Sequence, residues 1–283
     1  MRVSGSEPTV NTTLIDGSPA DQIPADDRGL AYGDGLFETL AVRDGLPCLW
    51  ERHLARLREG AARLAIPLPD PRLLEREALA LCAGRARAVL KLTLTRAGGG
   101  RGYRPAAQAA GRRILSLSDW PGFPEPLQAQ GVRVRLCQTR CATSPQTAGL
   151  KHLGRLEQVL ARAEWDDPGI PEGVMLDADG LVVEGTQSNL FLDRGGHLFT
   201  PLLDRAGVAG VVRGLVMDEA AALGDPVREV RVPLAALDAA DALYLTNSLI
   251  GVWRVASFRE HRFALHLPMH PAIVRSVERV YAP

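Results

Sequence analysis

The alternation of apolar and polar residues along the first part of the chain predicts a small sheet with two helices. Apolar positions alternate with polar ones on both sides of the turns Asp16-Gly17 and Asp44-Gly45, which is the period-two pattern of strands. Apolar residues then recur at helical spacing, which predicts amphipathic helices over Glu51 to Leu64 and Arg72 to Cys82. Two further strands are expected, joined across a run of glycines: Ala88 to Arg96 and Arg113 to Ser118.

A cluster of helix- and strand-breaking residues follows this first unit, in the sequence PGFPEP at 121–126. Such a density of proline and glycine predicts a linker. We therefore predict a small N-terminal α/β domain over residues 1–119, a linker at 120–127 and a larger domain over 128–283. The elements predicted beyond the linker are a strand at Val132 to Cys137, a helix at Arg155 to Trp165, short strands from Gly173 to Phe199 with a turn at Asp179-Gly180, a helix at Val211 to Leu223, a strand at Ala242 to Leu245 and a closing helix at Pro271 to Tyr281.

The composition narrows the classes of partner. The 283 residues include 33 Lys and Arg against 33 Asp and Glu, and this balance gives no electrostatic reason to expect nucleic acid or an anionic membrane. No apolar run approaches the ~20 residues of a membrane span, and the N-terminal sequence lacks the apolar core of a signal peptide, so we expect a cytoplasmic protein. The 4 cysteines form no CxxC pair and the 6 histidines show no ligand spacing, which predicts reduced, mostly buried cysteines and no metal.

Lysine is rare in this chain, which has only Lys91 and Lys151. Arginine serves nearly everywhere that a positive charge is enough, so a lysine that persists can do what a guanidinium cannot: lose its proton, act as a base or form an imine. Lys151 lies between a polar loop and the amphipathic stretch Leu153 to Trp165, where a nucleophile can be held in place. The alternative is that both lysines persist by chance, without a special role.

Six short motifs follow one another along nearly the whole chain: AYGDGLFETL, HLARL, GLKHLGRLEQVLARAE, VVEGTQSNLFL, TPLLDRAGVAGVVRG and LTNSLIGVWRV. Each is weak evidence alone. In this order the series resembles the fold-type IV pyridoxal-phosphate enzymes, which include branched-chain aminotransferases, D-amino-acid aminotransferases and 4-amino-4-deoxychorismate lyases. The resemblance implies an α/β (α+β) D-amino-acid-aminotransferase-like fold, with a smaller N-terminal α/β domain and a larger C-terminal domain built on a mixed, barrel-like sheet. It also implies pyridoxal 5'-phosphate as the cofactor.

The chemistry of that cofactor requires a lysine for the imine, an anion beside the ring nitrogen and a cup for the phosphate. By resemblance, Lys151 is the imine lysine and Glu184 is the carboxylate that keeps the pyridine nitrogen protonated. The resemblance assigns binding of the phosphate to Arg56 and to the turn Gly210-Val211-Val212, which begins a helix and whose N–H groups and dipole favour an anion. Two further polar residues, Asn247 and Ser248, are expected nearby. Taken singly, Glu184 could be a solvated carboxylate at a strand end, Arg56 an exposed helix arginine and Gly210 a plain helix start.

Within the family, the segment KLTLTR followed by GGGRGY, and the unbroken KHLGRLEQVLAR, look like the aminodeoxychorismate lyases. Branched-chain aminotransferases usually carry an asparagine-tyrosine pair where this chain has Arg155-Leu156. Gly154 departs from the lyase pattern, which has asparagine there. The resemblance therefore implies a lyase that forms 4-aminobenzoate and pyruvate for folate synthesis. The alternatives are a D-amino-acid or branched-chain aminotransferase with the same cofactor and a catalytically silent binding protein, against which Lys151 and Glu184 both argue.

The substrate of such a lyase, aminodeoxychorismate, is a dianion, so its site needs cations and hydrogen-bond donors. By resemblance we expect Lys91, Arg101 and Tyr103 to bind its carboxylates. The alternative is that the glycine-rich segment is only a hairpin turn and Lys91 an edge-strand charge. In the family this loop reaches toward the active site of the neighbouring subunit, so the resemblance also implies a homodimer.

Overall fold

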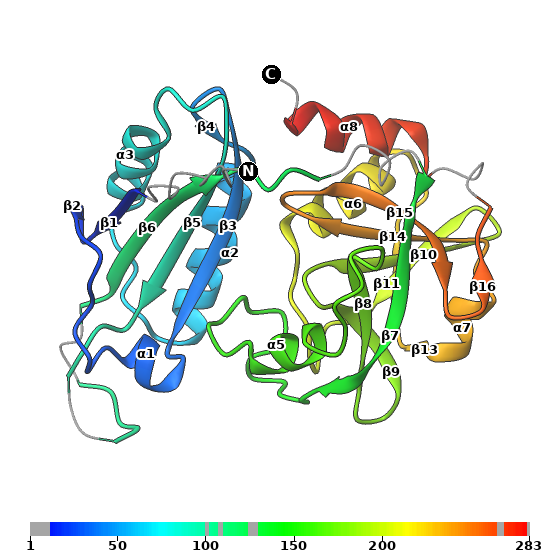
Figure 1. Cartoon of the computed structure of the whole chain (residues 1–283), viewed down its shortest axis with the longest axis horizontal. Coiled ribbons are helices and arrows are strands. Elements are labelled where there is room, and N and C mark those ends of the chain that lie inside the picture. The colour runs from blue at the N-terminus through cyan, green and yellow to red at the C-terminus, as the bar shows by residue number, and fades with distance from the viewer. Residues whose placement is uncertain (1–11, 100–101, 107–109, 124–129, 265–268, 282–283) are drawn as a thin grey trace, which may run out of the picture. The chain divides into compact units, whose positions relative to one another are not determined.

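The computed structural model describes residues 12–99, 102–106, 110–123, 130–264 and 269–281. The chain divides between Pro121 and Gly122 into two compact units (Figure 1). The linker predicted at 120–127 overlaps residues 124–129, which lie outside the described residues, so the predicted domain boundaries stay a prediction. Within the described residues, none of the helices is long and apolar enough to cross a membrane.

The first unit is an antiparallel sheet with the strand order β2-β1-β6-β5-β3-β4. The longer helices α2 and α3 lie against the sheet (Figure 1). In chain order its elements are β1 (Thr12–Ile15), β2 (Ser18–Pro19), α1 (Arg28–Tyr32), β3 (Gly35–Arg43), β4 (Leu46–Pro47), α2 (Trp50–Arg63), α3 (Pro71–Cys82), β5 (Arg87–Thr95) and β6 (Arg112–Asp119).

Local chemistry explains why these elements form where they do. Asp16 and Asp44 both have positive φ, 52° and 46°, and each is followed by a glycine, which is the geometry of a tight hairpin turn. Helix α3 begins where the Asp70 side chain accepts a hydrogen bond from the N–H of Arg72, with proline in the first turn, a favourable N-terminus. The predicted helices and strands of this unit are confirmed; the short helix α1 was not predicted.

The second unit contains one mixed sheet with the strand order β12-β11-β10-β14-β15-β7-β8-β9-β13, and β16 pairs with β15. Strand β7 runs parallel to β15 and to β8, and β9 also lies against β10 and β11, so the sheet curls back on itself as a barrel-like sheet does. In chain order the elements are β7 (Val132–Cys141), α5 (Leu156–Arg162), β8 (Glu172–Asp177), β9 (Leu181–Gly185), β10 (Asn189–Arg194), β11 (His197–Pro201), α6 (Val211–Ala222), β12 (Arg228–Val230), β13 (Val232–Pro233), α7 (Leu234–Asp238), β14 (Ala242–Asn247), β15 (Gly251–Phe258), β16 (His261–Arg262) and α8 (Pro271–Tyr281).

The core of the second unit fixes the strands that carry polar residues at their ends. Alternate residues of β10, β14 and β15 meet in one apolar cluster that includes Leu190, Leu245 and Trp253. A smaller cluster contains Cys137 and Cys141 together with residues of α5, β8 and β9. All four cysteines are free and three are buried, as the sequence predicts. The structure corrects two predicted bounds: β7 extends to residue 141, and α5 spans only residues 156–162.

Candidate active site

Lys151 lies in an irregular loop that is fixed to a distant part of the chain. Just before it, Gly149 pairs with Val208 in an isolated parallel bridge. The N–H of Gly149 donates to the carbonyl of Gly207, and the N–H of Ala209 donates to the carbonyl of Gly149, both at 2.9 Å. Gly149 has φ of +80°, a conformation that glycine adopts without strain. The half-buried side chain of Lys151 therefore extends from a loop whose position is set by the 207–209 segment.

Glu184 is held by the same segment. It is the penultimate residue of β9 and is only 4% exposed, and its Oε2 accepts a hydrogen bond of 2.8 Å from the N–H of Val208. Burial raises the pKa of this carboxyl, while the charge of Arg155, the Val208 N–H and the charge of Lys151 act in the opposite direction. A buried carboxyl of this kind ionises most readily when a further cation lies against it.

The 207–209 segment leads directly into helix α6, whose N-cap is Gly210. The side chain of Asn189, at the start of β10, also contacts this segment: its Nδ2 donates to the carbonyl of Val208 at 2.8 Å. A Cβ atom at position 210 would lie 1.9 Å from Oδ1 of Asn189, so any larger residue here would displace the Asn189 side chain. No side chain caps α6 among the described residues, and the N–H groups of its first turn, which includes Val211 and Val212, provide the positive end of the helix dipole.

A second buried carboxylate, Glu172, shapes the turn between β9 and β10. It is 2% exposed and accepts hydrogen bonds from the N–H groups of Gly173, Thr186 and Gln187 and from the hydroxyls of Thr186 and Ser188. Burial raises its pKa although these donors act against the shift. Glu172 thus fixes the chain between Glu184 and Asn189. Sequence reasoning missed it, because a lone glutamate at a strand start carries no signal of the donors that surround it.

The turn between β14 and β15 carries the predicted residues Asn247 and Ser248. Oδ1 of Asn247 accepts from the N–H groups of Leu249 and Ile250 at 2.8 and 3.0 Å, and its Nδ2 donates to the carbonyl of Gln187 at 3.1 Å. The amide of Asn247 is therefore used to build this turn. The amide thereby shapes the backbone next to the half-buried Ser248, and the part of both residues in phosphate binding stays a prediction.

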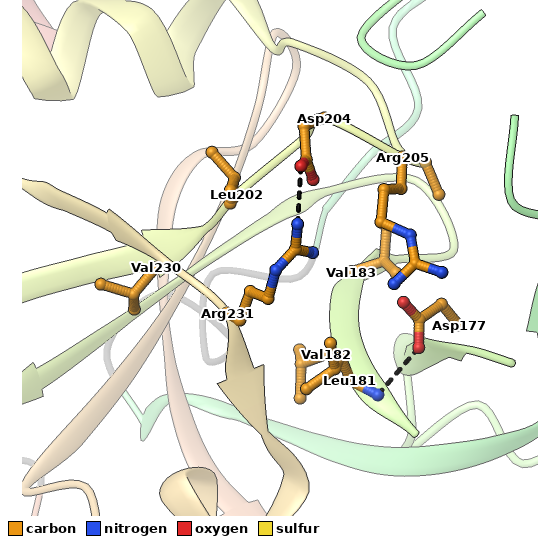
Figure 2. Close-up of a pocket in the computed structure, with 10 residues that line it drawn as sticks. Asp177, Leu181, Val182, Val183, Leu202, Asp204, Arg205, Val230 and Arg231 are labelled. Carbon is orange, nitrogen blue, oxygen red and sulfur yellow. Dashed lines mark hydrogen bonds and ion pairs between the residues drawn. The ribbon is translucent and has the colours of Figure 1, made fainter. Parts of the chain in front are cut away.

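These residues of the second unit fit a pyridoxal phosphate. The structure brings the Lys151 loop, the buried Glu184 carboxyl and the glycine N-cap of α6 onto one short segment, and these are the amine, the anion and the anion-binding N–H groups that the cofactor needs. A separate small cavity lies close to Val183 and Ala206. Its volume is about 10 Å³, enough for about one water molecule. Figure 2 shows this cavity beside the ion pair of Arg231 with Asp204.

In the first unit, Arg56 on α2 is bound by the buried Glu38 of β3. The Nε of Arg56 donates to Oε1 of Glu38 at 2.9 Å and its Nη2 to Oε2, while Nδ1 of His53 lies 2.6 Å from the same Oε2. Burial alone would raise the pKa of Glu38, but Arg56 and His53 outweigh it and lower the pKa to about 2. The predicted phosphate arginine is therefore a half-buried side chain with a fixed orientation and not an exposed helix arginine.

The predicted substrate residues have different surroundings. Lys91 is exposed on β5, with its Nζ 5.3 Å from the centre of the Phe37 ring. Tyr103 is 85% exposed, and the centre of its ring lies 5.4 Å from the centre of the Tyr32 ring. Arg101 lies outside the described residues.

The loop that carries Tyr103 is anchored by Arg28 of α1. Its guanidinium donates to the carbonyls of Gly102 and Tyr103, both at 2.9 Å, and to Asp34 at 2.8 Å. Sequence reasoning missed Arg28, because the pattern around α1 gives no indication that its side chain crosses to a distant loop.

The comparison with known proteins identifies the family. A family model described as amino-transferase class IV matches residues 35–258. The chain belongs to the class IV amino-transferase family. The solved structure of 4-amino-4-deoxychorismate lyase from Pseudomonas aeruginosa is 51% identical to this chain, with a TM-score of 0.87 and coverage of 94% of this chain and 97% of that chain.

Two further relatives mark the alternatives within the class IV amino-transferase family. Aminodeoxychorismate lyase of Vibrio harveyi is 33% identical over 255 residues, which are 90% of this chain and 94% of the relative. Branched-chain-amino-acid aminotransferase of Escherichia coli is 26% identical over 244 residues, which are 81% of this chain and 78% of the relative. The similarity is thus higher to these two lyases than to this aminotransferase.

Proposed function

We propose that the chain is a pyridoxal-phosphate-dependent lyase that converts 4-amino-4-deoxychorismate to 4-aminobenzoate and pyruvate, a step toward folate. The observation that carries the proposal is the position of the 207–209 segment. It is hydrogen-bonded to the Lys151 loop, donates a hydrogen bond to the Glu184 carboxyl and leads directly into helix α6. The 51% identity to a lyase structure supports the lyase over the aminotransferase reading. A D-amino-acid or branched-chain aminotransferase is the alternative activity for the same residues.

The cofactor would be held by Lys151 through a covalent bond and by Glu184 at its ring nitrogen. Its phosphate would be bound by the first-turn N–H groups from Gly210 to Val212 and by Ser248, and Arg56 remains a predicted phosphate ligand. When bound, pyridoxal phosphate supplies an electron sink for the carbon that bears the substrate amine. The buried Glu184 stabilises that sink, because an ionised carboxylate beside the ring nitrogen favours its protonated form.

Lys151 moves the protons of the reaction. Once the substrate amine has displaced it, its neutral Nζ removes the proton from the ring carbon that bears the amine. The carbon–oxygen bond to the enolpyruvyl group then breaks as the ring becomes aromatic. Nζ of Lys151 returns the proton to the departing group, which leaves as pyruvate. The atoms of the substrate are divided between the two products, so neither water nor an oxidant is consumed.

The proposed dimer is supported by an exposed apolar stripe on α5. Leu156, Val159 and Leu160 are 69%, 61% and 54% exposed and lie at the i, i+3 and i+4 positions of one helix face. We propose that a second copy of the chain covers this face. Sedimentation equilibrium should give the mass of a dimer, and Val159→Glu should shift the equilibrium toward the monomer; a wild-type monomer at micromolar concentration would contradict the proposal.

Product analysis separates the lyase from the aminotransferases. The purified protein should release 4-aminobenzoate and pyruvate in equal amounts from aminodeoxychorismate, and should turn over D-alanine or leucine with 2-oxoglutarate far more slowly. Faster transamination than lyase activity would refute the proposal.

The substrate loop gives a finer test of the same proposal. Arg101→Ala should lower kcat/KM for aminodeoxychorismate roughly ten- to a hundredfold, the worth of a charge-assisted hydrogen bond. Any residual activity on D-alanine, which has one carboxylate, should fall less. Equal losses for both substrates, or no loss for either, would show that specificity is set outside this loop. Cofactor binding serves as the control and should be unchanged.

A further inference from the structure

The side chain of Arg155 turns back from the start of α5 to the loop that carries Lys151. Its Nη2 donates to the carbonyl of Leu150 at 2.8 Å, and its Nε donates to the carbonyl of His152 at 2.9 Å. Leu150 and His152 are the two neighbours of Lys151 in the chain. One guanidinium therefore binds the backbone on both sides of the lysine.

This contact binds the irregular stretch of chain between the Gly149 bridge and helix α5. The Lys151 loop is anchored on its N-terminal side by the Gly149 bridge, His152 forms a single further bridge, and helix α5 begins at Leu156. Backbone carbonyls between these points need hydrogen-bond donors, and a guanidinium offers five in a rigid, planar fork. A lysine at the same position could place a charge there, but its single ammonium group lacks that fork.

The charge of Arg155 also acts on two ionisable groups beside Lys151. Among the groups that oppose the burial of Glu184, Arg155 acts most strongly on the pKa of its carboxyl. Burial, assisted by Arg155, lowers the pKa of His152 to about 4. His152 is therefore neutral at neutral pH, so that Arg155 and not His152 is the permanent cation next to the lysine.

We propose that Arg155 is a positioning residue for Lys151: its forked contact with the carbonyls of Leu150 and His152 fixes the backbone from which the lysine extends. The inference rests on the proposed function, since it concerns the lysine that is to bind the cofactor. Arg155 does not itself touch the reacting atoms in this proposal. It sets the rate at which Nζ of Lys151 reaches the aldehyde carbon of pyridoxal phosphate.

The test uses the full-length protein without cofactor, with Arg155→Met and Arg155→Lys as variants. Arg162→Met is the matched control, because the Arg162 guanidinium also donates to a backbone carbonyl near α5, that of Trp165 at 2.9 Å. Pyridoxal phosphate is added, samples are reduced with borohydride over time, and the modified lysine is measured by peptide mass mapping. Thermal unfolding of each variant is measured in parallel.

Arg155→Met should slow the modification of Lys151 roughly ten- to a hundredfold, the effect of losing charge-assisted hydrogen bonds. Arg155→Lys restores the charge without the fork and should rescue the rate only in part, and Arg162→Met should react like the wild type. A wild-type rate in Arg155→Met, or full rescue by Arg155→Lys, would overturn the proposal. If Arg155→Met does not fold, the rate of Arg155→Lys decides alone.

A separate reagent distinguishes this proposal from the proposed function. If the wild type forms no cofactor bond at Lys151, the proposed function fails. The rate at which acetic anhydride acetylates Lys151 then still compares the variants, with Lys91 as the internal reference. A change of the Lys151 rate relative to Lys91 in Arg155→Met supports the positioning role, and an unchanged ratio overturns it.

Discussion

Replacing Glu38 with glutamine should destabilise the protein strongly, and in a way that depends on pH. Glu38 is 2% exposed and its carboxylate is bonded by Arg56 and His53, which together lower its pKa from 4.5 to about 2. A carboxyl whose pKa is lower in the folded than in the unfolded chain stabilises the fold above the unfolded pKa. This stabilisation is lost as the pH falls toward the folded pKa.

The size of the effect follows from the two pKa values. A difference of about 2.5 units corresponds to ~3 kcal/mol at pH 7, at 1.36 kcal/mol per unit. The same relation leaves about 2.5 kcal/mol at pH 4 and about 1.5 kcal/mol at pH 3. The free-energy difference between wild type and Glu38→Gln should shrink in the same way.

Urea unfolding of both proteins at pH 7, 4 and 3, followed by circular dichroism, measures this difference. Glu59→Gln is the control: Glu59 lies on helix α2 together with His53 and Arg56, is 69% exposed and forms a 3.8 Å ion pair with Arg63. We expect the control to change stability by less than ~1 kcal/mol at every pH. A Glu38→Gln protein within 1 kcal/mol of wild type at pH 7, or a difference that does not depend on pH, would refute the reasoning.

Three further predictions concern the cofactor. Lys151→Ala should lose the covalent lysine–cofactor bond and nearly all turnover, whereas Lys91→Arg should keep the bond. Borohydride reduction followed by peptide mapping identifies the modified lysine, and a label on Lys91 would contradict the prediction. Glu184→Gln should keep the bond but slow single turnover roughly a hundredfold or more, and a wild-type rate would make Glu184 merely structural. Gly210→Ala should weaken pyridoxal-phosphate binding at least ~10-fold, because its Cβ would lie 1.9 Å from Oδ1 of Asn189; an unchanged Kd by fluorescence titration contradicts this.

Periodicity was enough to predict most of the elements. The helices α2, α3, α6 and α8 each bury one face, so the positions of their apolar residues are visible in the sequence. Helix α1 has five residues and is held by the Asp27 cap, too short a segment for a period to appear. The strand β15 was not predicted, although its residues alternate between buried and partly exposed positions over most of its length.

Candidate site residues could be named from the sequence where one residue type identifies the chemistry. Lys151 and Glu184 stand in family motifs, and the structure connects the Lys151 loop and the Glu184 carboxyl through Val208. The partners that hold them could not be predicted, because a buried hydrogen bond depends on which segments meet in space. Arg155 is an example. The sequence pattern places Arg155 inside a helix, yet α5 begins only at the next residue, and the Arg155 side chain is hydrogen-bonded to the Lys151 loop.

The bridge between Gly149 and Val208 also sets an order on folding. These residues are separated along the chain by α5 and by the strands from β8 to β11, and closing such a long segment costs entropy that only the completed sheet can offset. The Lys151 loop therefore takes its final position late, after β9 and β10 have paired with their neighbours. During refolding, the capacity to capture pyridoxal phosphate should lag behind the recovery of secondary structure, so cofactor capture would report the final step in the assembly of the second unit.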